Sequence, residues 1–386
     1  MPYYKPLKQL PEPERKRIVA GIQGLRQQFK EQAFPEKKTA ESLILGSWNI
    51  RNFDDDRFNY GPRLQESLYY LAEIISRFDV IAVQEVCQDL APLDALMDIL
   101  GRQYRYILTD VTHSSLGGNK ERLGFIYDKN KVFFKGVAGE LVLPDKMLIS
   151  DASNKKRQFS RTPFGAQFQS GWFKFLFSTV HIFYGSNSPR SPSYERRVKE
   201  IAAVAKYLAK QAKVSDLNQV LVGDFNIKAH GSAGFNALQQ NGFTIVKNRK
   251  GSNRDQTKFY DQISFISRRD ELQLKQAERQ DRVFQFFDSV FRLSDFNLYK
   301  PLLKQHIQTK LQLAKQQVDC ASTNKKLKKA EDKLASLQAV LVSDESLFDY
   351  YQEWRTFQMS DHLPLWVELE IDFSDKYLEY LSDYQA

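Results

Sequence analysis

The sequence is poor in cysteine and has no long hydrophobic run. Its two cysteines, Cys87 and Cys320, lie far apart among 386 residues. A disulfide framework or a thiolate zinc site would need more cysteines, so neither is predicted, and a reducing compartment is the simpler setting. The N-terminus lacks the apolar run of a secretory signal, and no stretch approaches the roughly 20 apolar residues of a membrane span. We therefore expect a soluble, cytoplasmic protein that has no membrane partner.

The composition indicates a folded protein with a large core. Apolar residues make up 42% of the chain and aromatic residues 13%, with 28 Phe and 18 Tyr. That is enough apolar side chain to build a core without covalent cross-links. The formal charge of +9 favours a polyanionic partner, such as nucleic acid or an anionic lipid surface, although many soluble proteins are as basic.

The pattern of apolar residues predicts many short strands and few helices. The first strand is expected over 42–50 and the second over 80–83, with a helical stretch over 63–77 between them. Later strands are expected over 104–108, 123–127, 165–168, 173–180, 219–222, 244–246, 262–266 and 365–371, and further helices over 93–100 and 194–212. This order fits two packed sheets with helices outside them.

Two segments differ from this pattern. Residues 1–40 are polar around one helical stretch over 12–30, so we expect an N-terminal helical extension that lies outside the core. Residues 293–345 are rich in Lys, Gln and Leu and predict a helical hairpin with a turn at 319–324. The remaining parts are a main domain formed by 41–292 and 346–373 and a C-terminal tail over 374–386.

The predicted hairpin is basic. Between Lys300 and Glu345 there are nine lysines and five acidic residues. Two apolar stripes at helical spacing would let its arms pack together antiparallel; they consist of Leu303, Ile307, Leu311, Ala314 and Val318 on the first arm and Leu327, Ala330, Leu334, Leu337 and Leu341 on the second. We hypothesise that the hairpin binds nucleic-acid backbone. An ordinary solvated helix surface and a docking site for a protein partner are the alternatives.

Carboxylates and amides stand at or just beyond the ends of several predicted strands, where active sites are commonly built. These residues are Asn49, Glu85, Asp224, Asn226, Asp261 and Asp361. Oxygen ligands of this kind suit Mg²⁺ or Ca²⁺. In the segment Asp224-Phe225-Asn226, both polar side chains fall on one face of an extended chain, so both can reach one substrate or metal.

Two of the five histidines lie beside such strand ends. His181 follows an apolar strand, and His362 follows Asp361. Imidazole exchanges protons near neutral pH, particularly where a carboxylate fixes its tautomer. A single histidine in such a place is more often structural, but the combination with the carboxylates favours an acid–base site.

These motifs, in this order, resemble the endonuclease/exonuclease/phosphatase superfamily, and within it the branch of pancreatic-type deoxyribonuclease. The matching segments lie within about 42–292 and 346–372; they are Trp48-Asn49-Ile50, Gln84-Glu85-Val86, Lys120-Glu121-Arg122, Phe159-Ser160-Arg161-Thr162-Pro163, Val180-His181, Gly223-Asp224-Phe225-Asn226, Tyr260-Asp261-Gln262-Ile263 and Ser360-Asp361-His362-Leu363-Pro364. The resemblance implies an α/β (α+β) fold, a four-layer sandwich of two packed, mostly antiparallel sheets flanked by helices. The chain departs from the branch at Cys87 and Asn119, where DNA-contacting Arg and Tyr stand in that branch.

The resemblance also implies roles for these residues. Glu85 would bind the principal metal, Mg²⁺ with Mn²⁺ or Ca²⁺ as alternatives, helped by Asn49, Asp361 and Asp224. Asp224 and Asn226 would contact the phosphate, the attacking water or a second metal. Glu121 would orient His181, and Asp261 would orient His362. Arg122, Arg161 and Asn49 would bind the phosphate, since a guanidinium can hold two phosphate oxygens at once.

The implied activity is metal-assisted, in-line attack of water on a phosphodiester, with histidine as general acid and base. DNA is the expected substrate. An inositol phosphatase or a sphingomyelinase would use a similar core, but Leu221-Val222-Gly223-Asp224 lacks the tryptophan of the inositol phosphatase motif, and no apolar membrane-touching hairpin is seen. A catalytically silent scaffold on the same fold is the alternative from outside the enzymes.

Overall fold

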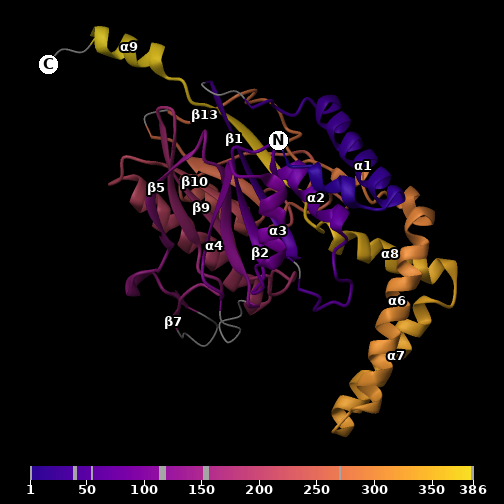
Figure 1. The fold of residues 1–386 in the computed structure, drawn as a ribbon. Coiled ribbons are helices and arrows are strands. Elements are labelled where there is room, and N and C mark those ends of the chain that lie inside the picture. The colour runs from indigo at the N-terminus through magenta and orange to yellow at the C-terminus, as the bar shows by residue number, and fades with distance from the viewer. Residues whose placement is uncertain are drawn as a thin grey trace.

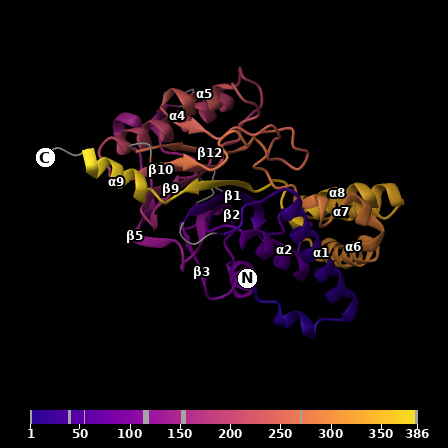
Figure 2. The same ribbon diagram turned by 90° about the horizontal axis from the view of Figure 1, so that it is seen from above.

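The computed structural model describes residues 2–37, 41–53, 55–112, 119–150, 156–268 and 271–383. His113 lies outside the described residues. Within this part of the chain the strands form two large sheets that pack face to face, and helices cover their outer faces (Figures 1 and 2). The fold is therefore the four-layer α+β sandwich that the sequence predicts.

Each large sheet has six strands among the described residues, and each has one central parallel pair within otherwise antiparallel neighbours. The first sheet has the order β13 (Gln273–Leu274), β14 (Leu365–Glu370), β1 (Ser42–Phe53), β2 (Val80–Val86), β4 (Arg122–Asp128) and β3 (Tyr104–Leu108). The second has the order β11 (Thr244–Ile245), β12 (Asp261–Ile266), β10 (Asn218–Asp224), β9 (Phe173–His181), β8 (Phe164–Ser170) and β5 (Phe133–Glu140). A small ribbon pairs β6 (Ile149–Ser150) with β7 (Lys156–Arg157).

The parallel pairs lie at the centre of the core. In β1 the residues from Ser42 to Ile50 are all buried, because this strand has the second sheet on one face and helices on the other. Strands covered on both faces are expected to be continuously apolar rather than alternating. By contrast β5, at the edge of the second sheet, is exposed along its whole length, and no buried face marks it in the sequence. That explains why this strand was not predicted.

The helices form the two outer layers. Those beside the first sheet are α1 (Glu12–Glu31), α2 (Gln65–Ile75) and α3 (Ala91–Leu100), and those over the second sheet are α4 (Pro192–Ala212) and α5 (Ala233–Gln240). Short 3-10 turns lie at 5–9, 145–147, 286–288 and 293–295, and the C-terminal helix is α9 (Ser374–Asp383). Among the described residues, none of these helices is long and apolar enough to cross a membrane.

Helix α1 corrects one expectation. Ile18 and Leu25 are fully buried in the main hydrophobic core, and the ring of Phe29 stacks on Phe284 with centroids 4.2 Å apart. Arg17 forms an ion pair with the fully buried Glu66 of α2, with Nε and Oε2 2.7 Å apart. The prediction that this helix lies outside the core was therefore wrong; its apolar stripe packs on α2 and on the 284–291 segment.

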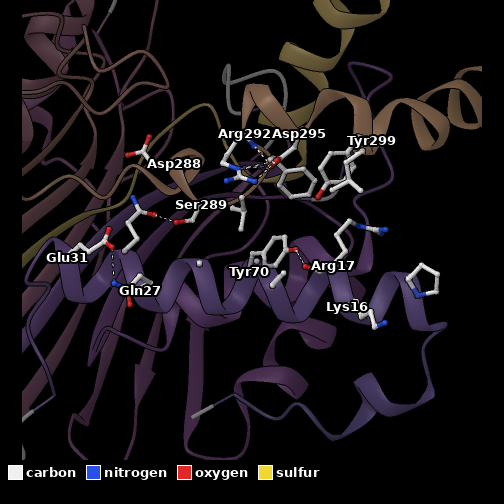
Figure 3. A pocket seen from close by; sticks show the side chains of 18 of the residues that line it. Lys16, Arg17, Gln27, Glu31, Tyr70, Asp288, Ser289, Arg292, Asp295 and Tyr299 are labelled. Atoms are coloured by element: carbon white, nitrogen blue, oxygen red, sulfur yellow. Dashed lines mark hydrogen bonds and ion pairs between the residues drawn. The ribbon is translucent and has the colours of Figure 1, made fainter.

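A groove of about 700 Å³ separates the outer side of α1 from the segment 288–299 (Figure 3). Polar side chains join its two walls: the hydroxyl of Ser289 donates to Oε1 of Gln28 at 2.7 Å. Arg292 and Asp295 pair with each other on the opposite wall at 2.8 Å. The hydrogen bond between Ser289 and Gln28 ties α1 to the segment that leads into the next helices.

The predicted hairpin consists of α6 (Phe296–Asp319) and α7 (Asn324–Val340). Its turn falls at 320–323, as the sequence predicts, and Leu303, Ile307, Ala314, Ala330 and Leu337 are buried. Figure 1 shows the pair standing out from the body of the molecule. A third helix, α8 (Asp344–Gln358), which the sequence reasoning did not predict, returns the chain to the core.

Candidate active site

The first sheet places Asn49 and Glu85 side by side at the ends of β1 and β2. The pairing of β2 shifts register between Val83 and Val86, and Glu85 in this irregularity has a left-handed backbone with φ of 63°. Such a conformation is rare for a residue with a side chain and clusters at functional sites. The Nδ2 of Asn49 donates to Oε1 of Glu85 at 2.8 Å, and the backbone amide of Asn52 donates to the other oxygen at 2.8 Å. The carboxylate of Glu85 is thereby fixed in position near the end of β2.

The second sheet places three predicted residues in one row across its strands. In the ladder, Asp224 of β10 pairs with His181 of β9 on one side and with Asp261 of β12 on the other. The row depends on Gly223, whose φ is 128° and where an added Cβ would lie 2.1 Å from the carbonyl oxygen of Val180. Only glycine fits this close approach of two backbones.

His362 reaches the same row from the loop before β14. Its Nδ1 lies 2.7 Å from Oδ2 of Asp261, and its Nε2 lies 3.8 Å from Oδ2 of Asp224. The loop is held by the hydroxyl of Ser360, which donates to the carbonyl of Asn49 at 2.6 Å, and by Nε1 of Trp48, which donates to the carbonyl of His362 at 2.9 Å. Burial by itself lowers the pKa of His362, but the charges of Asp261 and Asp224 outweigh it and raise this pKa well above its usual value.

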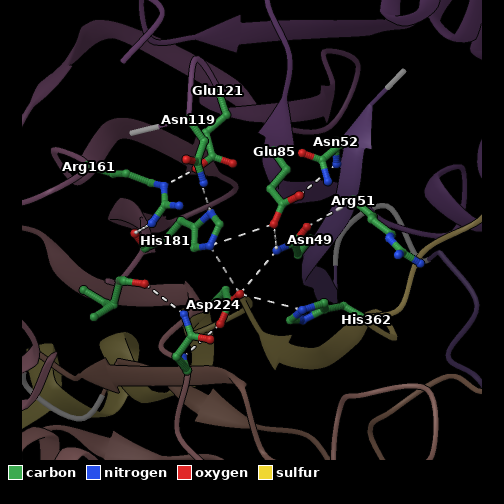
Figure 4. Close-up of polar contacts among 12 residues, drawn as sticks. Asn49, Arg51, Asn52, Glu85, Asn119, Glu121, Arg161, His181, Asp224 and His362 are labelled. Carbon is green, nitrogen blue, oxygen red and sulfur yellow. Dashed lines mark hydrogen bonds and ion pairs between the residues drawn. The ribbon is translucent and has the colours of Figure 1, made fainter. Parts of the chain in front are cut away.

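His181 approaches Asp224 from the other side (Figure 4). Its Nε2 lies 3.6 Å from Oδ2 of Asp224 and 3.9 Å from Oε1 of Glu85, and its Nδ1 lies 3.4 Å from Oε1 of Glu121. The same oxygen of Glu121 also contacts Nε of Arg161, and Nδ1 of His181 forms no hydrogen bond within the described residues. Burial and Arg161 lower the pKa of His181. Glu121 and Asp224 raise this pKa by a larger amount, so the net shift is upward.

Glu121 and Asp224 have opposite electrostatic surroundings. Burial alone would raise the pKa of Glu121, but His181 and Arg161 lower it to about 2, so this carboxylate stays ionised. Burial raises the pKa of Asp224, and the neighbouring Asp261 adds to the rise despite the two imidazoles. Asp224 is therefore protonated more easily than an ordinary aspartate, whereas Glu121 is protonated less easily than an ordinary glutamate.

Asn226 follows Asp224 with a left-handed φ of 54°. Its backbone amide donates to Oδ1 of Asp224 at 2.9 Å, and its Nδ2 donates to the carbonyl of Ile182 at 2.8 Å. The structure thus brings Asn49, Glu85, Glu121, His181, Asp224, Asn226, Asp261 and His362 together.

The three remaining predicted residues have other contacts. Arg122 donates through Nη1 to the carbonyls of Cys87 and Gln88, at 2.6 and 3.0 Å. Arg161 is buried against Glu121, and its guanidinium is engaged there and with the carbonyl of His181. Asp361 lies at the rim with a side chain that is 47% exposed. Phosphate binding by the two arginines and metal binding by Asp361 stay predictions.

The sequence reasoning missed Arg51, although this cation stands inside the motif Trp48-Asn49-Ile50-Arg51-Asn52. Its Nε lies 3.7 Å from Oδ1 of Asp361, and its Nη1 contacts the hydroxyl of Thr356 on α8. Figure 4 shows it at the edge of the cluster, on the side of His362. Its place inside that motif, two positions after Asn49, was the available signal. The ring of Tyr260, 5.7 Å from that of His362, was missed in the same way.

The donor set fits a hard divalent cation. Glu85 and Asp224 accept from the same amide donor, the Nδ2 of Asn49, at 2.8 and 3.3 Å, so their carboxylates lie close together, with the imidazole of His181 beside both. Two groups of three side chains bring possible ligand atoms within 4.8 Å of one another. One group is Glu85, Glu121 and His181, and the other is Asp224, Asp261 and His362. Oxygen-rich sets of this kind bind Mg²⁺, Mn²⁺ or Ca²⁺. These carboxylates and imidazoles could therefore hold a divalent cation.

The chain belongs to the Endonuclease/Exonuclease/phosphatase family, whose model matches residues 46–268. This family makes it a hydrolase that acts on phosphoester bonds. The match runs from within β1 to just past β12 and therefore includes every predicted site residue except Asp361 and His362. The resemblance read from the motifs is confirmed at the level of the family. No curated protein matches the sequence.

Solved structures similar to this chain come from several organisms. A mannosyl-6-phosphatase of Bacteroides thetaiotaomicron VPI-5482 is 19% identical, with 60% of this chain and 87% of that chain covered and a TM-score of 0.45. The human Nocturnin catalytic domain is 12% identical, with 61% and 84% covered and a TM-score of 0.44. D. rerio TDP2 in complex with a single strand DNA product is 17% identical, with 62% and 92% covered and a TM-score of 0.41.

Proposed function

We propose that this protein is a metal-dependent phosphodiesterase that hydrolyses nucleic acid, with DNA as the first substrate to test. One observation carries the proposal: two imidazoles face the same oxygen of Asp224, at 3.6 Å from His181 and 3.8 Å from His362, each with a buried carboxylate behind it. A phosphodiester needs a base for the attacking water and an acid for the departing oxygen. Two such pairs around one carboxylate supply both.

Each residue has a proposed part in this reaction. His181 and His362 would exchange the protons, while Glu121 and Asp261 hold them in position through their Nδ1 atoms. Asp224 and Asn226 would orient the water and the phosphate. Glu85, with Asn49 and Asp224, would hold the divalent ion, for which we propose Mg²⁺. When bound, the ion would supply positive charge to the phosphate oxygens and to the attacking water.

We also propose which segments of the chain form the catalytic unit and which form an insertion. Residues 41–292 and 346–373 would form the catalytic unit, since all the clustered side chains come from these segments. The hairpin 293–345 enters the chain between Asp261 and His362, two partners that lie 2.7 Å apart. An insertion at this place leaves the cluster of site residues intact and adds the hairpin as a separate element of the structure.

A substrate panel tests the proposal. Plasmid DNA, single-stranded DNA, RNA, bis-p-nitrophenyl phosphate, an inositol phosphate and a phospholipid head-group ester would each be incubated with Mg²⁺ or Mn²⁺. The His181→Ala/His362→Ala double variant serves as the control for contaminating activity. We expect metal-dependent cleavage of the generic diester and of nucleic acid by the wild-type protein alone. Cleavage of the inositol phosphate or the lipid ester without nucleic acid would overturn the substrate, and no hydrolysis at all would favour a scaffold.

A further inference from the structure

The outer part of the hairpin carries lysines that the fold does not neutralise. Lys325, Lys329 and Lys333 recur at four-residue spacing, so they lie along one face of α7. The first two are exposed and the third is half-buried. Within the described residues, none of the three forms an ion pair with a carboxylate. Like charges four residues apart destabilise an isolated helix, so this row is a feature that helix formation does not require.

The root of the hairpin, meaning the part of α6 that contacts the body of the molecule, differs from its outer part. There Lys300 pairs with Asp344 of α8, and Lys310 pairs with Asp56 of the loop after β1, each at 2.5 Å. Lys310 is itself buried. Two lysines near the body of the molecule thus have carboxylate partners, whereas Lys325, Lys329 and Lys333 have none among the described residues.

The root is joined to the candidate active site on two sides. Lys310 of α6 contacts Asp56, and the hydroxyl of Tyr350 on α8 donates to the carbonyl of Asn59 at 3.1 Å, so α6 and α8 together hold the loop that follows the Glu85-contacting Asn52. At its other end α8 leads directly to the loop that carries His362. The hairpin is thereby fixed in direction relative to the catalytic cluster.

We infer that the α6–α7 hairpin is an arm that binds the phosphate backbone of a nucleic-acid strand whose scissile bond lies in the cluster, with Lys325, Lys329 and Lys333 as phosphate contacts. The inference rests on the proposed function, since the strand is its substrate. The 17 residues of α7 extend about 26 Å at about 1.5 Å per residue, so the arm reaches nucleotides well outside the cluster. Short substrates would not reach it.

An anionic membrane is the other polyanion to consider, and the packing of the arm disfavours it. A helix that binds a lipid surface presents apolar residues beside its lysines. In α7 the apolar side is used inside the hairpin, because Leu337 is buried and Leu334 packs against the main core cluster. The exposed apolar side chains of the arm, Leu298 and Leu313, lie on α6, so the lysine face of α7 fits a phosphate backbone better than a lipid surface.

The test compares two triple variants that remove the same charge. Lys325→Gln/Lys329→Gln/Lys333→Gln alters the arm, while Lys206→Gln/Lys210→Gln/Lys213→Gln alters exposed lysines at the C-terminal part of α4, over the second sheet. Binding of the full-length protein to a 30-nucleotide single strand would be measured by fluorescence anisotropy in EDTA over a series of KCl concentrations. Hydrolysis of bis-p-nitrophenyl phosphate with Mg²⁺ would be measured in parallel.

We expect the arm variant to flatten the plot of log K against log salt by about 2, at about 0.7 for each lost contact, and the α4 variant to leave it unchanged. Both variants should hydrolyse the small diester as the wild-type protein does. An unchanged slope in the arm variant, or an equal change in both, overturns the inference. So does a loss of binding to phosphatidylserine vesicles with the strand-binding slope intact. A wild-type protein that binds the strand through the arm but hydrolyses no diester refutes the proposed function instead.

Discussion

His362 and Asp261 form a buried pair whose Nδ1 and Oδ2 atoms are 2.7 Å apart. Asp261 begins β12, and His362 enters from a loop 101 positions later in the chain, so the pair closes the site across the hairpin insertion. The carboxylate fixes the imidazole and leaves Nε2 directed at Asp224. Removing either member should therefore affect the electrostatics of the whole cluster.

The first prediction concerns the pKa of His362. Burial opposes its protonation, and Asp261 is the largest influence that raises the pKa above the usual value. Asp261→Asn should lower it, so the imidazole loses its proton at lower pH than in the wild-type protein. The ring-proton signal of His362 in metal-free protein, followed by NMR over pH, would show this. Asp255→Asn, at an exposed carboxylate, is the control; a signal that titrates alike in all three proteins contradicts the prediction.

The second prediction concerns the rate. His181→Ala and His362→Ala should each lower the hydrolysis of bis-p-nitrophenyl phosphate by roughly 10²-fold or more, as expected for loss of an acid–base group. His306→Ala is the matched control, because His306 lies on α6 beside Tyr350 and outside the cluster. Near-normal turnover in either site variant would refute its assigned role.

The third prediction concerns the divalent ion. Glu85→Ala should abolish tight Mg²⁺ or Mn²⁺ binding in calorimetric titration, since it removes the carboxylate that faces Asp224. Glu353→Ala is the control; this carboxylate lies at the rim, 48% exposed, near Arg51 and Arg254. Equal affinity in the wild-type and Glu85→Ala proteins would place the ion elsewhere.

Much of this site could be predicted because its residues stand in short motifs at strand ends. Asp224 pairs with His181 and with Asp261 across neighbouring strands. Predicting where these strands end therefore also predicts that the three side chains lie side by side. Tertiary contacts decide the rest. The contact of Arg161 with Glu121, 40 positions away in the sequence, could not be predicted, and phosphate binding by Arg161 stays a prediction. Arg122, one position further on, turns to backbone carbonyls.

The fold shows the same division. β1 and β10 contain short apolar runs, Leu43–Leu45 and Val220–Val222, and could be recognised as buried strands. Helix α1 has a clear apolar stripe, but whether that stripe faces the core or a surface depends on partners such as Glu66 and Phe284 that no local pattern reveals. In α8, the N-cap Ser343 and the helical spacing of Leu347, Tyr351 and Trp354 formed a local signal that the prediction did not use.

The fourth prediction concerns Gly223, which precedes Asp224. Gly223→Ala should destabilise the protein by more than the about 1–2 kcal/mol of a left-handed residue, because the new Cβ would also meet the backbone of Val180 at 2.1 Å. Gly242→Ala is the matched control: its φ of 87° carries a similar conformational cost, but nothing lies within 4 Å of the added Cβ. Urea unfolding of both variants would separate the two effects; equal losses would mean that the close approach does not matter.

The last prediction concerns the ion pair that joins α1 to α2. The Glu66 side chain is fully buried and that of Arg17 is 18% exposed, so Glu66→Ala would leave a guanidinium largely buried without its carboxylate. A loss of about 3 kcal/mol in the free energy of unfolding is expected, at the low end for buried pairs because Arg17 keeps some contact with water. Glu12→Ala breaks the exposed pair with Lys16 on the same helix and should cost less than about 1 kcal/mol.

The double variant Arg17→Met/Glu66→Leu tells the lost charge pairing from lost packing. It removes both charges and keeps apolar volume at the interface, so it should recover most of the stability that Glu66→Ala loses. Urea unfolding of the four proteins would provide the comparison. If Glu66→Ala and Glu12→Ala cost the same small amount, α1 is held by its apolar stripe alone, and the burial of Ile18, Leu25 and Phe29 would account for its attachment.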